Sequence, residues 1–480
     1  MNERLAKREA MLAVGLDPYP ISVKRNCSIR EALVKFGALS KARKKITLAG
    51  RVRSLRDQGK IIFADIEDDS GRIQGVIHRE VLGEDFDNVK KFMDSGDFVE
   101  ITGPLFATSR GQKSIEARAC RVVAKSIRPV PTEWFGLEDA ETRLRHRYLD
   151  LLLNPELKEF FRKKSAFWRH TRNFLLGEDF LEVETPVLEA IPGGADARPF
   201  KTHHNALDID LYLRISLELH LKRLLVGGFE KVFEIGRIFR NEGIDDEHLQ
   251  DYTQMEFYAA YMDHEELMAM IEKMTKYVLK NTFGTLKIET KGKKIDWGKK
   301  WPRVDYFSLL SEEWGADAEK LEIGELYGLA KKRGVDVPPK LGRGRVLDYI
   351  YKKTIRPKLL DPQFLVYPPA EVEPLAKRVP GRPGRVARVQ ILALGTELGK
   401  GFAELNDPVD QRERFEEQMK LRAAGDEEAQ RMDEDFVEAL EYGMPPAAGF
   451  GWSERIFTLV AGKTVREGVF FPLMRRREGK

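Results

Sequence analysis

Apolar and polar residues alternate along residues 229–262. The alternation predicts one strand over Val232–Arg240 and a second over Thr253–Tyr261, joined by a long polar loop. Because successive side chains of a strand point to opposite faces, the second strand places apolar residues on one face and Glu256 and Tyr258 on the other. We expect the rest of this region to be organised around these two strands.

Charged and polar side chains gather on the predicted hairpin. A hairpin with one face in water would also be polar on that face. That explanation does not account for an arginine at the end of a strand with a glutamate two residues later. The cluster favours a platform for a charged ligand, formed by Arg240, Glu242, His248, Glu256 and Tyr258.

The first 128 residues have a different pattern. Residues 1–45 predict short helices around a proline-rich break, with Ser28 as the N-cap of one helix. Residues 46–128 then contain five strand candidates and one helix near Asp85–Met93. Five short strands with an inserted helix predict a small closed β-barrel of the oligonucleotide-binding (OB) kind. The candidates are Ile46–Arg53, Ile61–Ile66, Gly71–His78, Phe98–Leu105 and Ser114–Ala124.

Phe63 has basic neighbours in this predicted barrel. OB barrels bind single-stranded nucleic acid with aromatic rings that stack on bases and cations that contact phosphates. Arg51, Arg53, Arg56 and Lys60 supply such cations. Phe63 is equally compatible with the hydrophobic core, with the cations on a solvated face, and the spacing leaves both interpretations open.

The remaining chain predicts a larger domain of mixed helices and strands. Residues 129–145 form a linker, and residues 146–480 form the domain. Phe180–Leu188 is a strand interrupted by Pro186, which suits an edge or an interface. Residues 281–345 have little pattern, and we interpret them as an inserted helical module.

Composition narrows the class of protein. The 480 residues include 81 basic and 77 acidic side chains, so nucleic-acid binding would depend on local basic surface rather than on net charge. Cys27 and Cys120 are the two cysteines, and no Cys-x-x-Cys occurs, which argues against structural zinc and fits a reducing, cytoplasmic location. We expect no signal peptide and no membrane span.

Several glycines and glutamates further along the chain suit a ligand site. The turn Gly193–Gly194 and the strand Gly449–Arg455 permit close backbone approach to a ligand, and the arginine of the latter can reach an anion. Glu218, Glu397 and Glu404 are glutamates within otherwise apolar, basic or glycine-rich segments. The chain has no P-loop and no Gly-x-Gly-x-x-Gly after a strand, so a nucleotide would bind by other means.

Three segments together resemble the signature motifs of class II aminoacyl-tRNA synthetases. Phe180–Leu188 resembles motif 1, Phe239–Glu242 with its loop and return strand resembles motif 2, and Gly449–Arg455 resembles motif 3. Within the class, the closest resemblance is to lysyl-tRNA synthetases, and it covers nearly the whole chain. It rests on Ile191–Ala195, Lys201–Asp208, Tyr212–Ile215, Arg240–Ile244 and Gly401–Asp407, with further matches at Gly71–Gln74 and Arg143–Leu152.

The resemblance implies an α+β fold with an N-terminal OB-fold barrel and a catalytic domain built on an antiparallel sheet flanked by helices. It also implies a homodimer that binds tRNA(Lys), with Arg56, Phe63 and Gln74 of the barrel contacting the anticodon.

The same resemblance implies ATP as a substrate and Mg²⁺ as a cofactor. Arg240 and Arg455 would be the catalytic residues, and Glu397 and Glu404 would ligate magnesium. The implied ATP contacts are Arg240, Glu242, His248, Tyr252, Glu397 and Arg455.

An amino-acid pocket is implied beside the ATP site. Burial of three carboxylates without cations would be very costly, and a ligand with two ammonium groups, such as L-lysine, would offset that cost. Such a site rejects uncharged analogues by roughly 10⁴-fold, because its own groups would stay unpaired. The implied lysine contacts are Gly194, Glu218, Glu256, Tyr258, Lys400, Phe402 and Glu404.

Three positions depart from the pattern of lysyl enzymes. Lys400 stands in place of the usual Asn, where it would pair with the substrate carboxylate, repel the substrate ammonium or neutralise Glu404. Gln390 stands in place of a second magnesium-binding Glu, which leaves the number of magnesium ions open. Gly449–Arg455 is one residue shorter than the usual motif 3.

Three other functions remain open on the sequence alone. An aspartyl- or asparaginyl-type enzyme shares the barrel and the motifs, but the acidic pocket argues against an anionic substrate. A protein-lysylating paralogue would resemble the catalytic half alone, and the barrel argues against it. A catalytically inactive synthetase-like protein would bind RNA without activating lysine.

Overall fold

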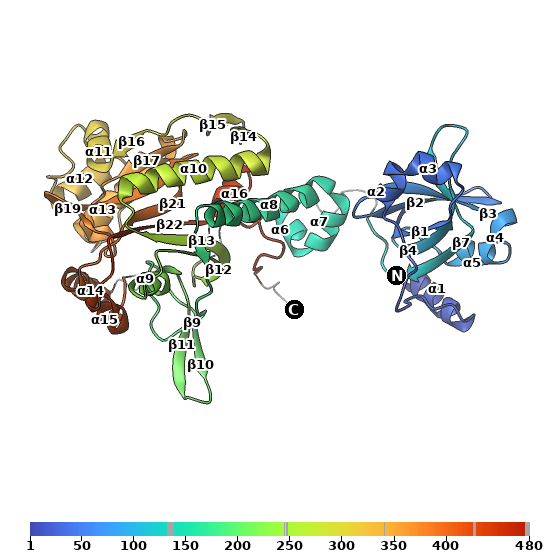
Figure 1. Cartoon of the computed structure of the whole chain (residues 1–480), viewed down its shortest axis with the longest axis horizontal. Helices are drawn as coiled ribbons and strands as arrows, with labels where there is room; N and C mark the ends of the chain where they lie inside the picture. Colours follow the sequence, from blue (N-terminus) through green and yellow to red (C-terminus); the bar gives the residue numbers. More distant parts are fainter. Residues whose placement is uncertain (132–138, 244, 246–247, 340, 426–428, 476–480) are drawn as a thin grey trace. The chain divides into compact units, whose positions relative to one another are not determined.

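A computed structural model describes residues 1–131, 139–243, 245, 248–339, 341–425 and 429–475. The chain divides into two compact units, Met1–Glu138 and Asp139–Lys480 (Figure 1). Of the predicted linker, residues 132–138 lie outside the described part of the chain. Helix α6 (Ala140–Arg145) follows directly, so the end of the predicted linker is helical.

The first unit contains one seven-stranded sheet with short helices around it. Its strand order is β5-β6-β3-β2-β1-β4-β7. The two ends of this order are joined by the chain itself, because β7 follows β6 after two residues, and β6 pairs with β3 while β7 pairs with β4. Backbone hydrogen bonds from Glu116 N–H to Pro104 and from Arg118 N–H to Thr102 hold this segment against β4, in agreement with the predicted OB-type fold. The elements are α1 (Asn2–Ala13), α2 (Ile29–Val34), α3 (Phe36–Lys41), β1 (Ile46–Asp57), β2 (Ile61–Asp68), β3 (Gly71–His78), α4 (Arg79–Leu82), α5 (Asp85–Phe92), β4 (Phe98–Gly103), β5 (Leu105–Ala107), β6 (Lys113–Glu116) and β7 (Ala119–Ala124).

The core of this unit lies on one face of the sheet. Ile62, Ala64 and Ile66 of β2 are buried in it, as period-two alternation requires. Phe63 is half-buried and is not part of that core cluster, so it lies on the opposite face. The N-terminal helices pack on the core side, and Ser28 caps α2 in a capping box, as the sequence predicts.

A mixed eight-stranded sheet is the centre of the second unit. Its order is β16-β17-β20-β21-β22-β13-β12-β8. The middle pairs are antiparallel, as expected, but the two outermost pairs are parallel. The strands are β8 (Leu181–Glu182), β12 (Lys231–Phe239), β13 (Asp251–Ala260), β16 (Arg303–Asp305), β17 (Gln363–Val366), β20 (Arg388–Ala393), β21 (Thr396–Ala403) and β22 (Ala447–Ser453).

Strands β12 and β13 are the hairpin predicted from the alternation. They pair antiparallel, with Val232 opposite Tyr258. Met255 and Phe257 of β13 belong to the core on one face of the sheet, while Tyr258 packs in a second cluster on the other face. This confirms the predicted assignment of apolar and polar side chains to the two faces.

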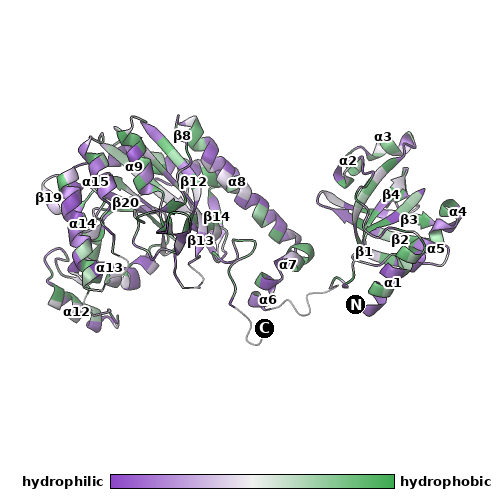
Figure 2. Ribbon diagram, turned by 90° about the horizontal axis from the view of Figure 1, so that it is seen from below, coloured by the Kyte–Doolittle hydropathy of each residue, from purple (hydrophilic) through white to green (hydrophobic). Residues whose placement is uncertain are grey.

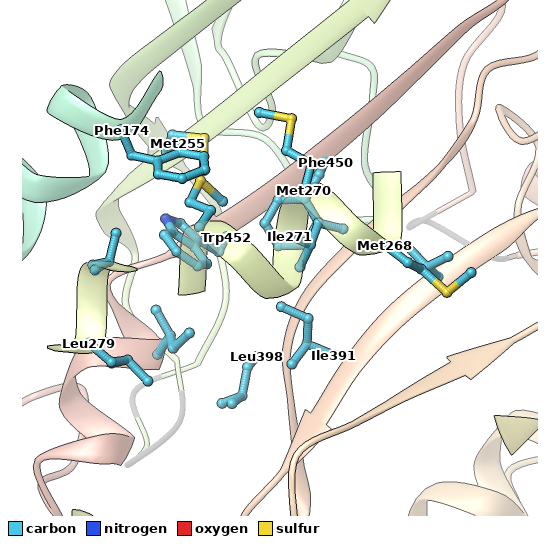
Figure 3. Close-up of a cluster of buried hydrophobic side chains, with 14 of the residues drawn as sticks. Phe174, Met255, Met268, Met270, Ile271, Leu279, Ile391, Leu398, Phe450 and Trp452 are labelled. Atoms are coloured by element: carbon cyan, nitrogen blue, oxygen red, sulfur yellow. The ribbon is translucent and has the colours of Figure 1, made fainter. Parts of the chain in front are cut away.

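Helices cover both faces of this sheet. Helices α8 (Pro155–Gly177), α10 (His264–Phe283) and α16 (Arg455–Val460) pack on one face, where Ile271 of α10 joins Phe450 and Trp452 of β22 in the core (Figure 3). Apolar and polar residues mix along α8, which buries one side (Figure 2). The other face carries α9 (Glu218–Val226), α14 (Pro408–Ala423) and α15 (Glu434–Glu441).

The segment 281–345 is only partly helical, which corrects its interpretation as a helical module. It opens with a hairpin, β14 (Lys287–Thr290) and β15 (Lys293–Asp296), and then contributes β16 to the main sheet. Trp297 and Trp301 are buried in the main core because the hairpin packs there. Helices follow only after that: α11 (Tyr306–Trp314), α12 (Ile323–Lys332) and α13 (Arg343–Thr354).

Short elements complete the unit. A three-stranded sheet has the order β10-β11-β9, and β18 pairs with β19. These and the remaining elements are α7 (Arg147–Leu153), β9 (Leu188–Glu189), β10 (Lys201–His204), β11 (Ile209–Leu213), η1 (Arg356–Lys358), η2 (Ala370–Val372), β18 (Arg378–Val379) and β19 (Arg382–Val386).

Candidate active site

A cavity of about 340 Å³ opens on the α9 face of the main sheet. It is lined by strands β13, β20, β21 and β22, by the start of α9, and by α13. All of the residues expected in the lysine and magnesium sites meet here, together with Arg240 of the expected ATP site, although they are far apart in sequence. Those lining the cavity are Gly194, Glu218, Arg240, Glu256, Tyr258, Glu397, Lys400, Phe402 and Glu404.

Glu256 is held by hydrogen bonds on both of its carboxylate oxygens. Ser216 Oγ donates to one oxygen at 2.8 Å, and the backbone N–H of Leu217 donates to the same oxygen at 3.1 Å. The amide of Gln254 also donates there, and Tyr258 OH donates to the other oxygen at 2.8 Å. Hydrogen bonds to the charged form stabilise a buried carboxylate, so Glu256 keeps its position without a ligand.

Lys222 is a buried cation between the other two carboxylates. Its Nζ lies 2.5 Å from Glu218 Oε1 and also pairs with Glu404. The rings of Phe402 and Phe436 flank the ammonium, with centroids at 5.3 and 6.0 Å. The side chain of Lys222 is fully buried, so this charge belongs to the pocket and not to the surface.

Burial dominates the protonation of these carboxylates. It raises the pKa of Glu404 well above its usual range and also raises that of Glu218, while Lys222 opposes both shifts. The two carboxylates raise the pKa of Lys222 against the effect of burial, so the lysine stays charged.

Lys222 was not among the residues predicted for the pocket, where Lys400 was the cation expected near Glu404. The missing signal was the i,i+4 spacing of Glu218 and Lys222, which places both on one side of helix α9. Of the three roles left open for Lys400, neutralisation of Glu404 is disfavoured, because Lys222 pairs with that carboxylate and Lys400 pairs with Glu373.

Two glycines allow the backbone to pass close to these side chains. A Cβ at Gly449 would lie 2.3 Å from the Tyr258 ring and 2.5 Å from Glu404 Oε1. Gly194 has φ of +81°, and a Cβ there would meet Ser216 and Glu218. A side chain at either position would fill the part of the cavity that the carboxylates line.

A second charged cluster occupies the β20–β21 side of the cavity. Glu373 accepts a hydrogen bond from Arg388 Nη1 at 2.5 Å and lies 3.3 Å from Lys400 Nζ. The amide of Gln390 donates to the carboxylate of Glu397. Burial raises the pKa of Glu397, but Arg388 and Lys400 outweigh burial and lower it overall, so this carboxylate is ionised.

Helix α13 closes one side of the cavity, which the sequence did not suggest. Asp348 and Lys352 face the cavity and pair at 2.6 Å. Arg345 lies 3.4 Å from Asp196, which follows the Gly193–Gly194 turn. The end of the segment 281–345, which the sequence suggested as an insertion, therefore forms part of the cavity wall.

Four of the expected ATP residues do not line the cavity. Tyr252 lies beside it, with its ring centroid 5.7 Å from the Arg240 guanidinium carbon. Arg455 donates to Thr396 Oγ1 at 2.8 Å. His248 is exposed and lies 2.8 Å from Asp245, and Glu242 is half-buried at the start of the same loop.

The donor set fits one magnesium ion carried with a nucleotide, and not a site built from protein alone. Among the described residues, no group of three or more His, Cys, Asp or Glu is arranged to hold a metal ion. Glu397 is an ionised carboxylate facing the cavity, and Mg²⁺ typically binds one or two carboxylates together with substrate phosphates. Glu404 fits less well, because it pairs with Lys222.

In the first unit, the three residues expected to contact nucleic acid share one face of the sheet. Arg56 is directly opposite Phe63, and its guanidinium lies 5.7 Å from the ring centroid. Gln74 lies opposite Asp65, two residues along from Phe63, and accepts from Ser114 Oγ at 3.1 Å. This favours an accessible Phe63 over a core Phe63, the two interpretations that the sequence left open.

No helix among the described residues is long and apolar enough to cross a membrane, and Cys27 and Cys120 are both free thiols.

Comparison with known proteins connects both units to translation. Residues 46–123 match the model of the OB-fold nucleic acid binding domain, and residues 139–475 match that of the tRNA synthetases class II (D, K and N). The chain is 43% identical to a lysine–tRNA ligase of Moorella thermoacetica, over 100% of this chain and 98% of that protein. It is 44% identical to one of Roseiflexus castenholzii (99% and 98% covered) and 38% identical to one of Staphylococcus haemolyticus (99% and 98%). The chain therefore belongs to the class II tRNA synthetase family for D, K and N.

Proposed function

We propose that this chain activates L-lysine with ATP and transfers it to the 3′ end of tRNA(Lys). The charge balance of the pocket is the observation that favours lysine as the amino-acid substrate. The group formed by the carboxylates Glu218, Glu256 and Glu404 and the ammonium of Lys222, on the α9 side of the cavity, has a formal charge of −2. The two ammonium groups of lysine match that charge, whereas aspartate and asparagine do not.

The residues around this pocket divide between the two ends of lysine. We propose that Glu404 and Tyr258 bind the side-chain ammonium, with Phe402 alongside its methylene groups. Glu218 and the backbone at Gly194 bind the α-ammonium. Glu256 holds Tyr258 and Ser216 in place through its hydrogen bonds.

The ATP site lies along the same cavity. We propose that Arg240 bridges the α-phosphate and the lysine carboxylate, as its position in the wall allows. Tyr252 and Arg455 would enclose the adenine ring. Glu242 would accept from the adenine amino group, and His248 would approach the outer phosphates. All four lie outside the cavity wall, with Tyr252 on β13 and Arg455 at the start of α16.

The reaction needs no nucleophile from the protein. The lysine carboxylate attacks the α-phosphorus of ATP, the bond to the bridging oxygen breaks, and pyrophosphate leaves with its electron pair. The terminal ribose hydroxyl of tRNA then attacks the adenylate carbonyl, and AMP leaves. Arg240 orients the two reacting anions and stabilises the charge on the phosphate. Mg²⁺, which Glu397 would hold, supplies further neutralisation of the phosphates when bound.

The tRNA contact belongs to the first unit. Phe63 and Arg56 offer a ring and a cation on one sheet face, as single-strand binding requires. We propose that they and Gln74 contact the anticodon. The reaction would take place in the cytoplasm, where Cys27 and Cys120 stay reduced.

We also propose a homodimer formed around motif 1. Exposed apolar side chains gather on β8, β9 and the loops next to them, and such patches mark interfaces. They are Leu181, Val187, Leu188, Ile191 and Phe229, each at least 37% exposed.

The test is ATP–pyrophosphate exchange with each of the twenty amino acids. We expect exchange with lysine alone at substantial rate. Glu404→Gln should raise the KM for lysine by about 10²-fold or more, because one ion pair to the ligand is lost, and should change the KM for ATP little. Equal effects on both constants would contradict the pocket assignment. Exchange with aspartate would point to the other branch of the family, and tRNA binding without any exchange would point to an inactive relative.

A further inference from the structure

Lys400 is a partly exposed lysine whose ammonium is held by an ion pair. Its Nζ lies 3.3 Å from Glu373, whose second oxygen accepts from Arg388 at 2.5 Å. The side chain of Glu373 is 9% exposed and that of Lys400 is 45% exposed. Because Arg388 fixes the carboxylate, Glu373 holds the ammonium at a defined place on the cavity wall.

The position of Lys400 places it next to the candidate magnesium ligand. Gln390 lies directly opposite Lys400 in the β20–β21 pair, and the Gln390 amide donates to Glu397. An N–H donor occupies a lone pair that a metal ion would use, and an amide adds no negative charge. Glu397 thus lies in a wall that also contains Arg388 and Lys400, which pair with Glu373, and Lys352, which pairs with Asp348.

This wall disfavours a second divalent ion. Each cation repels a metal ion at short range in a site that excludes part of the solvent. The same cations attract phosphate and carboxylate groups. Lys400, which is half-exposed beside Glu397, therefore offers a positive charge to phosphate and carboxylate groups on the β20–β21 side of the cavity.

We propose that Lys400 is a further catalytic residue, a protein-supplied cation that contacts the lysine carboxylate and the α-phosphate of ATP in place of a second metal ion, and that Glu373 positions it. The assignment rests on the proposed function, which names the two reacting anions. As the carboxylate oxygen bonds to the α-phosphorus and pyrophosphate leaves, the ammonium reduces the repulsion between the two anions and stabilises the charge on the phosphate.

The first experiment counts metal ions. Mn²⁺ is titrated by electron paramagnetic resonance into the protein bound to lysine and a non-hydrolysable ATP analogue. The double variant Lys400→Asn/Gln390→Glu removes the cation and adds a carboxylate beside Glu397. We expect it to bind one Mn²⁺ more per active site than the unmodified protein. Equal numbers of bound Mn²⁺ would overturn the proposal.

The second experiment measures the dependence of exchange on Mg²⁺. Lys400→Asn should lower the rate by about 10²-fold at low Mg²⁺, and high Mg²⁺ should restore part of it. Lys352→Asn removes another cation from the same wall, one that Asp348 pairs, and is the control for net charge. If both variants respond to Mg²⁺ alike, Lys400 has no special role.

The role of Glu373 is tested by a double-mutant comparison. Glu373→Gln should slow exchange in the unmodified protein and have little further effect in Lys400→Asn, because it acts through Lys400. An equal loss in both backgrounds would contradict a positioning role. Failure of the unmodified protein to exchange lysine would instead refute the proposed function, so the two failures are distinct.

Discussion

Lys222 lets two buried carboxylates face one pocket. Without it, Glu218 and Glu404 would repel each other at low solvent exposure, and one would take up a proton. With it, the helix α9 carboxylate and the β21 carboxylate share one ammonium. Lys222 therefore controls whether Glu404 is charged and able to bind the side-chain ammonium of lysine.

This role makes lysine binding depend on pH. The pKa of Glu404 is raised, so the ionised form that binds an ammonium is lost as pH falls through that raised value. We expect the Kd for lysine, measured by calorimetry, to increase as pH falls. Lys222→Met should move this increase to higher pH, because the cation that lowers the pKa of Glu404 is gone.

A matched variant separates charge from packing in that experiment. Lys222→Arg keeps a cation at the site and should leave the pH dependence close to that of the unmodified protein. Lys222→Met should also lower stability by about 3–5 kcal/mol, the usual cost of breaking a buried ion pair. If the two variants have the same pH profile, Lys222 does not set the charge of Glu404.

The sequence identified most of the cavity residues but not their arrangement. Glu218, Glu256 and Glu404 stand out because a carboxylate in an apolar context needs a partner. The partner of two of them was missed because a lysine within a helix usually extends to solvent. Glu373 was missed because it follows a second glutamate, Glu371, in a proline-rich segment that is typical of an exposed turn.

At the level of elements, alternation with period two located the strands that form the site. It predicted β13 and the face on which Glu256 and Tyr258 lie. The hairpin β14–β15 was missed because its short, lysine-rich strands bury few residues: Ile288, Thr290 and Ile295. The contribution of α13 to the cavity depends on long-range packing, which no local pattern reveals.

Phe63 on strand β2 provides a test of the proposed nucleic-acid-binding face. Phe63→Ala should reduce tRNA charging by about 10-fold or more, the expected loss when one base no longer stacks on an aromatic ring, and should leave pyrophosphate exchange intact. Phe98→Ala is the matched control, because Phe98 also pairs with an arginine, Arg51, at 4.2 Å. Equal losses in charging and in exchange would mean that Phe63 acts on the fold.

At the level of the whole molecule, the sequence predicted two kinds of domain and their order. Each unit has its own hydrophobic core, which is why patterns within each segment were informative. The hydrogen-bonded order of the first sheet, and the parallel strands at both edges of the second, follow from chain connections that local patterns do not contain.

The apolar surface near motif 1 gives a prediction at this scale. Leu188→Asp should shift the protein from dimer to monomer in sedimentation at micromolar concentration, because a charge would be buried at the interface. Val409→Asp changes a residue of similar exposure on α14 and should leave the sedimentation coefficient unchanged. A Leu188→Asp protein that sediments like the unmodified one would exclude this surface as the interface.

The surplus of negative charge in the pocket has a consequence for the free protein. Three buried carboxylates beside one ammonium are an unfavourable arrangement, which is why burial raises the pKa of Glu218 and Glu404, and bound lysine relieves it. The pocket is therefore electrostatically unfavourable in the free protein, and bound lysine supplies the cations that balance its carboxylates. The same carboxylates determine both the stability of the free protein and its selectivity for lysine. A substitution that removes a carboxylate and stabilises the free protein should therefore weaken lysine binding.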